Sequence, residues 1–311
     1  MELRIFTEPQ QGATYETQLA CARATREAGF GAWFRSDHYL NIGGDPHTAP
    51  GPTDSWVTLG ALAREVPDIR LGTMVTSATF RLPGPLAIQV AQVDQMSGGR
   101  IDIGLGSGWY DDEHTAYGIP FPPVGERFER LEEQLAILTG LWTTPAGQTF
   151  SHHGKHYTLV DSPALPKPAQ SPRPRLIVGG KGPKRTPRLA AVHADEFNIP
   201  FSSLEESGEQ FQRVRAACAE IGRDPGELTY GVAQTVAVGK DEAEAARRAA
   251  NIGRDLDELR ANGVAGTVDE AVERLEAFAQ AGAERVYLQV MDMSDLEHIA
   301  LLGEAVAPRV A

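Results

Sequence analysis

Short runs of β-branched and apolar residues alternate along the chain with longer stretches whose apolar residues recur every three or four positions. The first pattern predicts strands and the second predicts amphipathic helices. The predicted strands are 3–7, 31–36, 69–76, 101–107, 175–179, 196–201, 229–238 and 285–290. The predicted helices are 15–28, 55–65, 85–96, 126–142, 184–194, 204–221, 242–262, 268–281 and 294–307.

This alternation predicts βαβ units around a parallel sheet. Eight repeats favour a closed (β/α)8 TIM barrel of the α/β class, with a functional site at the carboxyl ends of its strands. An open, doubly wound sheet is the alternative. We interpret residues 1–311 as a single barrel domain.

Residues 143–173 interrupt the alternation between the fourth helix and the fifth strand. The run HHGKHYTLV predicts a hairpin that turns at Gly154-Lys155, and a Pro-rich stretch follows it. We expect this insertion to lie over the barrel mouth.

Composition narrows the range of partners. The chain has 29 Lys and Arg against 42 Asp and Glu, a net charge of −13, which disfavours nucleic-acid binding. It has no apolar run of 18 residues and no apolar leader, so we expect neither membrane insertion nor secretion. The two cysteines, Cys21 and Cys218, lie far apart, which is typical of a reducing compartment. We therefore expect a cytoplasmic protein that acts on a small molecule.

The second strand ends in the polar run Arg35-Ser36-Asp37-His38. At this end of a barrel strand, side chains face the functional site. Asp37 is a hydrogen-bond acceptor, and His38 can exchange protons near neutral pH. The alternative is a loop histidine with a structural hydrogen bond.

The fourth strand carries glycine on every second position. Because side chains alternate between the faces of a strand, Ile101, Ile103 and Leu105 should pack under the helices. Gly104, Gly106 and Gly108 would then form a strip that lets a flat group approach the backbone. The alternative is that a barrel interior needs small residues opposite large ones. The spacing does not match the dinucleotide-binding fingerprint.

The fifth strand ends in Gly179-Gly180-Lys181, just before a helix begins, which is a plausible anion site. An ordinary strand-to-helix turn is the alternative. Residues 155–188 contain one acid, Asp161, and a surplus of basic side chains. These are Lys155, Lys167, Arg173, Arg175, Lys181, Lys184, Arg185 and Arg188. Such a field would steer a polyanion to the mouth, unless it is simply a solvated surface.

Three histidines cluster in the insertion, at positions 152, 153 and 156. They surround the predicted hairpin turn and lie away from the strand ends, so we predict no metal site there.

Taken together, these segments resemble the bacterial luciferase-like monooxygenase superfamily, and in particular its oxidoreductases that use the deazaflavin coenzyme F420. The matching segments are FRSDHYL (34–40), RLGTMVTSATFRLPGPLA (70–87), VDQMSGGRIDIGLGSGWYDDEHTAYGIPFPPVGERFERLEEQL (93–135), PKPAQSPRPRLIVGGKGPKRTPRLAAVHAD (166–195) and GTVDEAVERLEAFAQAGAERVYLQV (266–290). FMN-dependent members share part of this pattern.

The resemblance implies an eight-stranded barrel with a flat flavin-type ring across its mouth. It places Asp37 and His38 beside the ring and a non-prolyl cis peptide at Met74-Val75 behind it. The other implied cofactor contacts are Thr76, Ser77, Ser107, Gly108 and Asp112, with Gly179, Gly180 and Lys181 at the phosphate. Sugar-phosphate dehydrogenases of the family carry a catalytic glutamate where this chain has Trp109.

The resemblance implies an enzyme that transfers a hydride between coenzyme F420 and a small organic substrate. His38 would exchange the accompanying proton, and Asp37 would position the ring or the imidazole. One alternative is an FMNH2-dependent monooxygenase on the same barrel, and another is a flavin-type binding protein without turnover. Family members are often homodimers, and the resemblance leaves that assembly open here.

Overall fold

Eight parallel strands close into a barrel in the computed structural model, which describes residues 1–45, 47 and 49–310. The strands are β1 (Glu2–Thr7), β2 (Ala32–Arg35), β3 (Arg70–Ser77), β4 (Ile101–Gly106), β7 (Arg175–Gly179), β8 (Glu196–Pro200), β9 (Thr229–Gly239) and β11 (Arg285–Val290). They run in the order β9-β11-β1-β2-β3-β4-β7-β8, and pairing of β8 with β9 closes the ring. The predicted TIM barrel is confirmed, and each predicted strand lies within two residues of the observed one.

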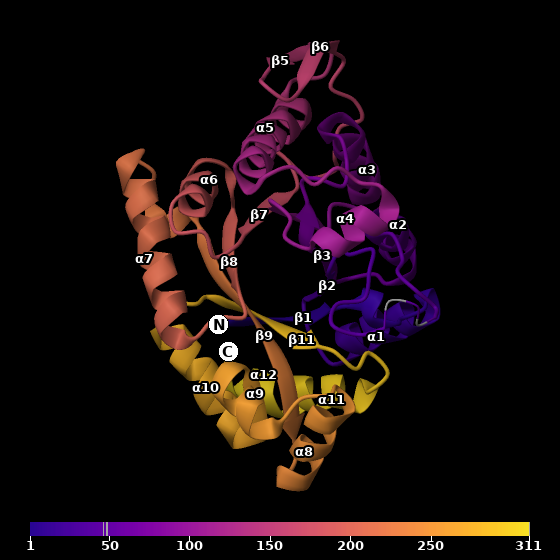
Figure 1. The fold of residues 1–311 in the computed structure, drawn as a ribbon, viewed down its shortest axis with the longest axis vertical. Coiled ribbons are helices and arrows are strands. Elements are labelled where there is room, and N and C mark those ends of the chain that lie inside the picture. Colours follow the sequence, from indigo (N-terminus) through magenta and orange to yellow (C-terminus); the bar gives the residue numbers. More distant parts are fainter. Residues whose placement is uncertain (46, 48, 311) are drawn as a thin grey trace.

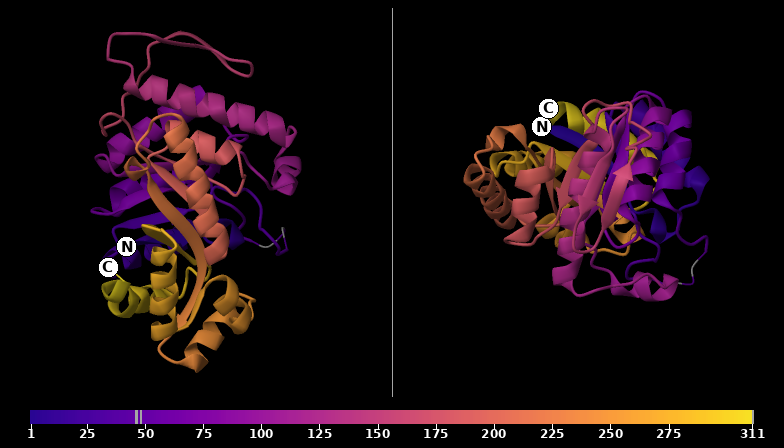
Figure 2. Two further views of the ribbon diagram at one scale, coloured as in Figure 1. Left: turned by 90° about the vertical axis from the view of Figure 1, so that its left-hand side faces the viewer. Right: turned by 90° about the horizontal axis from the view of Figure 1, so that it is seen from above.

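The helices lie outside the strands (Figure 1). They are α1 (Tyr15–Glu27), α2 (Ser55–Glu65), α3 (Pro83–Ser97), α4 (Asp111–Tyr117), α5 (Val124–Thr143), α6 (Arg185–His193), α7 (Leu204–Glu220), α8 (Glu242–Asn251), α9 (Leu256–Asn262), α10 (Val268–Gln280), α11 (Leu296–Leu301) and α12 (Ala307–Val310). The two ends of the chain lie side by side, and the amino group of Met1 donates to the carbonyl of Val310 at 3.2 Å (Figure 2). No helix in the described part of the chain is both long and apolar enough to span a bilayer.

Four elements differ from the prediction, and one of them is α4, for which no helix was expected. The helix expected over 242–262 is two helices, α8 and α9, because the chain turns between them with Gly253 at φ +70°. The strand β10 (Val264–Thr267) follows and pairs with the far end of β9. The helix expected over 294–307 begins at Leu296 and passes through a π-helical turn, Leu302–Val306, before α12.

The insertion forms the predicted hairpin from β5 (Phe150–His153) and β6 (Thr158–Ser162). Its turn is held by Glu133 of α5, whose carboxylate accepts the backbone N–H of Lys155 at 2.9 Å and of Tyr157 at 2.9 Å. The hairpin therefore packs against the outside of α5, at the edge of the molecule (Figure 1).

The Pro-rich stretch after the hairpin reaches the opposite end of the barrel from the mouth. The Gln170 amide donates to Asp94 at 2.8 Å and accepts from Arg70 at 2.8 Å, and Arg70 begins β3. These contacts lie at the amino ends of the strands, so the expected placement of the insertion over the mouth does not match them.

Most buried apolar side chains fall into two layers, and a small third cluster packs where the far end of β9 meets α8, α9 and β10. Ile101, Ile103 and Leu105 of β4 are fully buried in the larger layer between strands and helices, as predicted. A smaller layer lies inside the barrel and consists of Phe6, Ala32, Phe34, Met74, Ile177, Ala233 and Tyr287, with Val75 packed against it. Towards the amino ends of the strands the interior becomes ionic, where Arg4 donates to Asp102 at 3.0 Å.

The glycines of β4 accommodate a side chain of the neighbouring strand. The pairing of β3 with β4 shifts register between Thr73 and Thr76. A β carbon on Gly104 would lie 2.6 Å from Val75 Cγ1, and one on Gly106 would lie 3.0 Å from Val75 Cγ2. Val75 thus occupies the space over the predicted strip, and the alternative of small residues opposite a large one is the correct interpretation for these two glycines.

We expect Gly104→Ala to destabilise the barrel by roughly 1–3 kcal/mol, as overpacking of a well-filled interior does. The added methyl would lie 2.4 Å from the carbonyl oxygen of Thr73, which the ladder cannot move cheaply. Chemical denaturation measures the effect. Gly84→Ala on α3 is the matched control, because nothing lies within 4 Å of its β carbon. Equal stability of the two variants would contradict this packing.

Candidate active site

The chain after β2 enters the mouth of the barrel, and its buried carboxylate, Asp37, is held by the protein itself. Asp37 Oδ2 accepts from Thr76 Oγ1 at 2.9 Å and pairs with the guanidinium of Arg81. Arg81 also donates to Asp54 at 2.6 Å and to the Tyr39 hydroxyl at 2.7 Å. These contacts fix the loop after β2. They also leave the Asp37 carboxylate and the Thr76 hydroxyl already hydrogen-bonded within the protein.

His38 is anchored through one ring nitrogen. Its Nδ1 lies 2.9 Å from Glu113 Oε1, and the backbone N–H of Tyr39 donates to Glu113 Oε2 at 2.8 Å. The Glu113 side chain is 1% exposed and that of His38 is 15% exposed. Because a carboxylate only accepts, Nδ1 carries the hydrogen. The other nitrogen, Nε2, has no hydrogen-bond partner among the described residues.

The charge of Glu113 changes the acidity of His38. Burial lowers the pKa of the imidazole, since it disfavours the charged form. The hydrogen bond and the charge of Glu113, assisted by Glu8 and Asp37, outweigh burial, so the pKa of His38 is raised above its usual value. Glu113 therefore favours the protonated form of His38 and holds its ring in one orientation.

The third strand supplies the base of the mouth. The Met74–Val75 peptide bond is cis, as the resemblance implied. Met74 is 8% exposed and Val75 is half-buried, and both lie beside the inner apolar layer. Ser77 follows at the carboxyl end of the strand with 7% of its surface exposed.

The end of β4 brings aromatic rings to the mouth. Ser107 is half-buried, and Gly108 adopts a left-handed conformation with φ +79°. Trp109 is 63% exposed and stacks on Tyr110 with ring centroids 5.2 Å apart, and it meets His38 edge to face with ring centroids 5.8 Å apart. An exposed aromatic pair beside the imidazole offers an apolar surface to a substrate. Asp112 is exposed on α4 and has no hydrogen bond to any described residue.

Gly179, Gly180 and Lys181 lead from β7 to α6. Gly180 has a φ of +144°, and Lys181 donates to the carbonyl of Phe201 at 2.8 Å. Lys184 is the N-cap of α6 and provides no side-chain cap, so the side chains leave the first N–H groups of this helix available. Free N–H groups at a helix start bind phosphate.

The basic residues of 155–188 do not all gather at the mouth. Lys155 pairs with Glu129 on the hairpin side of α5, Arg188 pairs with Glu132, and Arg173 pairs with Asp195. Lys181, Lys184 and Arg185 lie on the β7–α6 connection, are exposed, and form no salt bridge within the described residues. The positive field expected to attract a polyanion therefore comes from these three cations alone. The other basic side chains are paired with acids or lie elsewhere on the fold.

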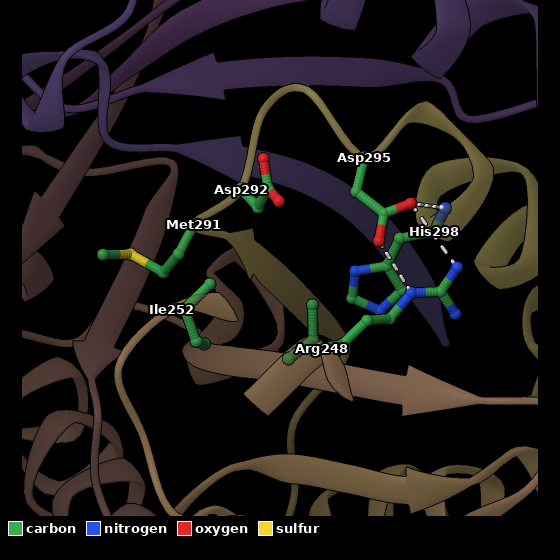
Figure 3. A pocket seen from close by; sticks show the side chains of 7 residues that line it. Arg248, Ile252, Met291, Asp292, Asp295 and His298 are labelled. Atoms are coloured by element: carbon green, nitrogen blue, oxygen red, sulfur yellow. Dashed lines mark hydrogen bonds and ion pairs between the residues drawn. The ribbon is translucent and has the colours of Figure 1, made fainter. Parts of the chain in front are cut away.

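A second hollow lies between β9, α8 and α11 (Figure 3). There Arg248 donates to Asp295 at 2.9 Å, and His298 Nε2 accepts the N–H of Val238 at 3.1 Å. Burial, helped by the charge of Arg248, lowers the pKa of His298 to about 3. The volume of about 10 Å³ holds roughly one water molecule. These polar groups satisfy one another, so we place the active site at the barrel mouth.

Comparison with known proteins identifies the family. Residues 1–285 match the family described as luciferase-like monooxygenase. The chain belongs to the luciferase-like monooxygenase family. Within this family, an FMNH2-dependent dimethylsulfone monooxygenase of Pseudomonas putida is 33% identical over 195 residues, which are 61% of this chain and 52% of that protein. An F420-dependent glucose-6-phosphate dehydrogenase of Microbacterium testaceum is 34% identical over 176 residues, which are 55% of this chain and 48% of that protein. These matches span about half the length of the curated relatives.

Solved structures share the whole barrel. An F420-dependent secondary alcohol dehydrogenase, in complex with an F420-acetone adduct, superposes with a TM-score of 0.84 at 19% identity and covers 100% of this chain and 99% of its own. The coenzyme F420-dependent tetrahydromethanopterin reductase of Methanopyrus kandleri has a TM-score of 0.83 at 19% identity, with the same coverage. At these identities the likeness shows the shared barrel fold alone.

The resemblance implied a catalytic glutamate where this chain has Trp109, and the structure brings the carboxylate of Glu113 on α4 to His38. Glu113 and His114, the two buried polar residues of α4, were not among the predicted site residues. The acidic first turn and the following Gly118 were the available signal, because acids favour a helix start and glycine favours its end.

We expect Glu113→Gln to lower the pKa of His38, because the amide removes the negative charge that stabilises the imidazolium. A pH titration of the His38 ring protons by NMR measures this shift in wild type and variant. Glu132→Gln on α5 is the control, since that carboxylate pairs with Arg188 and has no contact with His38. A His38 pKa that is the same in all three proteins would contradict the proposed electrostatic coupling.

Proposed function

We propose that this chain is an oxidoreductase that transfers a hydride between coenzyme F420 and a small organic substrate, with His38 moving the accompanying proton. The observation that carries the proposal is the His38–Glu113 pair, in which the imidazole is anchored through Nδ1 and free at Nε2. It lies at the carboxyl end of a barrel strand, where sites of this fold lie. Membership of a family with F420-dependent relatives supports the redox class.

The residues of the mouth fit a flavin-type group. Val75 provides an apolar base, while Ser77, Ser107 and Gly108 add polar atoms around it. Gly179, Gly180 and Lys181, with the uncapped start of α6, suit a phosphate. Asp112 remains a proposed contact at the rim. When bound, the deazaflavin supplies the hydride acceptor or donor, and the protein supplies orientation and electrostatics.

The predicted roles of Asp37 and Thr76 change within this proposal. Arg81 and Thr76 already engage the Asp37 carboxylate, and the Thr76 hydroxyl is used for that contact. We therefore assign Asp37 and Thr76 to holding the loop that carries His38. His38 keeps the catalytic role, because Nε2 can accept or release a proton while Glu113 prevents the ring from turning.

Two observations bear on the choice of cofactor. Three exposed cations, Lys181, Lys184 and Arg185, carry more positive charge than one phosphate requires, which favours a cofactor with further anionic groups. Coenzyme F420 has such groups in its oligoglutamate tail, whereas FMN has none. The similarity to an FMNH2-dependent relative favours the second candidate, a monooxygenase on the same barrel.

A titration of the protein with coenzyme F420 and, separately, with FMN distinguishes the candidates. We expect F420 to bind in the micromolar range or tighter and FMN to bind much more weakly. Tryptophan quenching gives the readout, because Trp109 is exposed at the mouth while Trp33, Trp56 and Trp142 are buried. The Trp109→Phe variant, followed by cofactor fluorescence polarisation, verifies the origin of the quenching.

The opposite preference would support the monooxygenase, and oxygen uptake with FMNH2 would then be measured. Binding of F420 without any absorbance change against lipophilic secondary alcohols, or of its reduced form against conjugated enones, would indicate a binding protein. Binding of neither cofactor would reject the proposal.

We expect His38→Ala to lower kcat by about 10²–10⁴-fold with the best substrate of that panel, as loss of a general acid–base does. The affinity for F420, measured by polarisation, separates this loss from a binding defect. His193→Ala is the control for histidine removal, because His193 ends α6 on the outside of the barrel. Normal turnover of the His38 variant would exclude His38 from proton transfer.

A further inference from the structure

Behind Ser77, three hydrogen-bonding side chains form a line that the proposed reaction does not use. Ser77 Oγ lies 2.6 Å from Thr79 Oγ1, which lies 2.6 Å from His114 Nε2. The other ring nitrogen of His114, Nδ1, lies 2.6 Å from the carbonyl oxygen of Tyr110. His114 is 1% exposed and packs between Phe80 and Phe121, with ring centroids at 5.2 Å and 4.3 Å. The line thus leads from the mouth into the interior of the protein.

The carbonyl of Tyr110 sets the direction of every hydrogen bond in this line. A carbonyl oxygen can only accept, so Nδ1 of His114 carries a hydrogen, and in a neutral imidazole it is the only ring nitrogen that does. Nε2 is then an acceptor and takes the single hydroxyl hydrogen of Thr79. The Thr79 oxygen in turn accepts the hydroxyl hydrogen of Ser77. Ser77 therefore has no hydrogen left to donate into the mouth.

The surroundings hold Ser77 in this state. The position of Gly108 leaves no room for a side chain, since a β carbon there would lie 2.4 Å from Ser77 Oγ. The loop that carries Thr79 is fixed by Gln134 of α5, which donates to the carbonyl of Ala78 at 2.6 Å. The backbone N–H of Thr79 makes one long contact to Ser77 Oγ at 3.4 Å. A lone pair of the Ser77 oxygen remains for a ligand.

We propose that His114 is a positioning residue that, through Thr79, makes Ser77 a pure hydrogen-bond acceptor for an N–H group of the bound cofactor ring. This inference rests on the proposed function, because it needs a ring with an N–H donor at the mouth. Ser77 would then select ligands by the kind of hydrogen-bonding group they present. A ligand that presents an acceptor to Ser77 is disfavoured, since two oxygen lone pairs would then face each other. Deazaflavin and flavin rings both carry an N–H, so the inference holds for either cofactor.

The first test needs no cofactor. In protein labelled with ¹⁵N-histidine, we expect the long-range ¹H–¹⁵N spectrum of His114 to show a protonated Nδ1 and an unprotonated Nε2. The signals are assigned by their loss in His114→Gln. A hydrogen on Nε2 would overturn the inference, because Thr79 would then be free to donate to Ser77. This outcome is independent of whether the chain binds F420.

The second test is a double-mutant cycle on cofactor binding. Thr79→Val keeps the shape and removes the hydroxyl, and we expect it to weaken binding by roughly five- to tenfold, about the effect of one hydrogen bond. Ser77→Ala should weaken binding by a similar factor. The double variant should be no weaker than Ser77→Ala alone, because Thr79 acts only through Ser77. Thr79→Ser, which restores the hydroxyl, should restore wild-type affinity.

Controls separate this role from a structural one. Thr143→Val on α5 also removes a threonine hydroxyl, one that bonds only the backbone of its own helix, and should leave binding unchanged. Thermal unfolding of every variant shows whether the barrel is intact. A loss caused by Thr79→Val that persists in the Ser77→Ala background, or no loss at all, would refute the inference. If neither F420 nor FMN binds the wild type, the proposed function fails, while the state of His114 still decides whether the line of hydrogen bonds exists.

Discussion

The active-site geometry depends on one buried carboxylate. Glu113 of α4 accepts from the His38 ring and from the backbone N–H of the next residue, so it fixes both the side chain and the chain that carries it. Removed from water, its charge acts strongly on the imidazole and raises the pKa of His38. The same short helix carries His114 on the adjacent position. One turn of helix therefore organises two polar groups on two sides of the mouth.

The barrel interior imposes the second constraint. Val75 points over β4 and β7, and the strands tolerate it only because Gly104, Gly106 and Gly179 leave its space free. A β carbon on Gly179 would lie 3.2 Å from Val75 Cγ1. The glycines of the fourth strand thus make room for the Val75 side chain. Val75 in turn forms the base of the mouth. A ring placed there would rest on an apolar side chain rather than on bare backbone.

Charge is arranged differently on the two ends of the barrel. Arg4, Asp102, Glu196 and Arg285 neutralise one another inside the amino end. At the mouth, Arg81 pairs with both Asp37 and Asp54, while the three cations of the β7–α6 connection form no salt bridge among the described residues. The positive charge left over lies beside the uncapped start of α6. This asymmetry makes the mouth the end that suits an anionic cofactor.

The sequence by itself determined the barrel, because eight apolar runs and the helices between them record a local periodicity that the backbone must satisfy. It also pointed to His38 and to the Gly179-Gly180 turn as candidate site residues, since both follow directly from a strand end. Only the tertiary structure decided which groups touch. Glu113 lies 75 positions from His38, and Thr79 lies 35 positions from His114, so no local pattern links them. The path of the insertion and the pairing of most basic side chains likewise depend on contacts between distant segments. The periodicity of apolar residues along the chain does not predict such contacts.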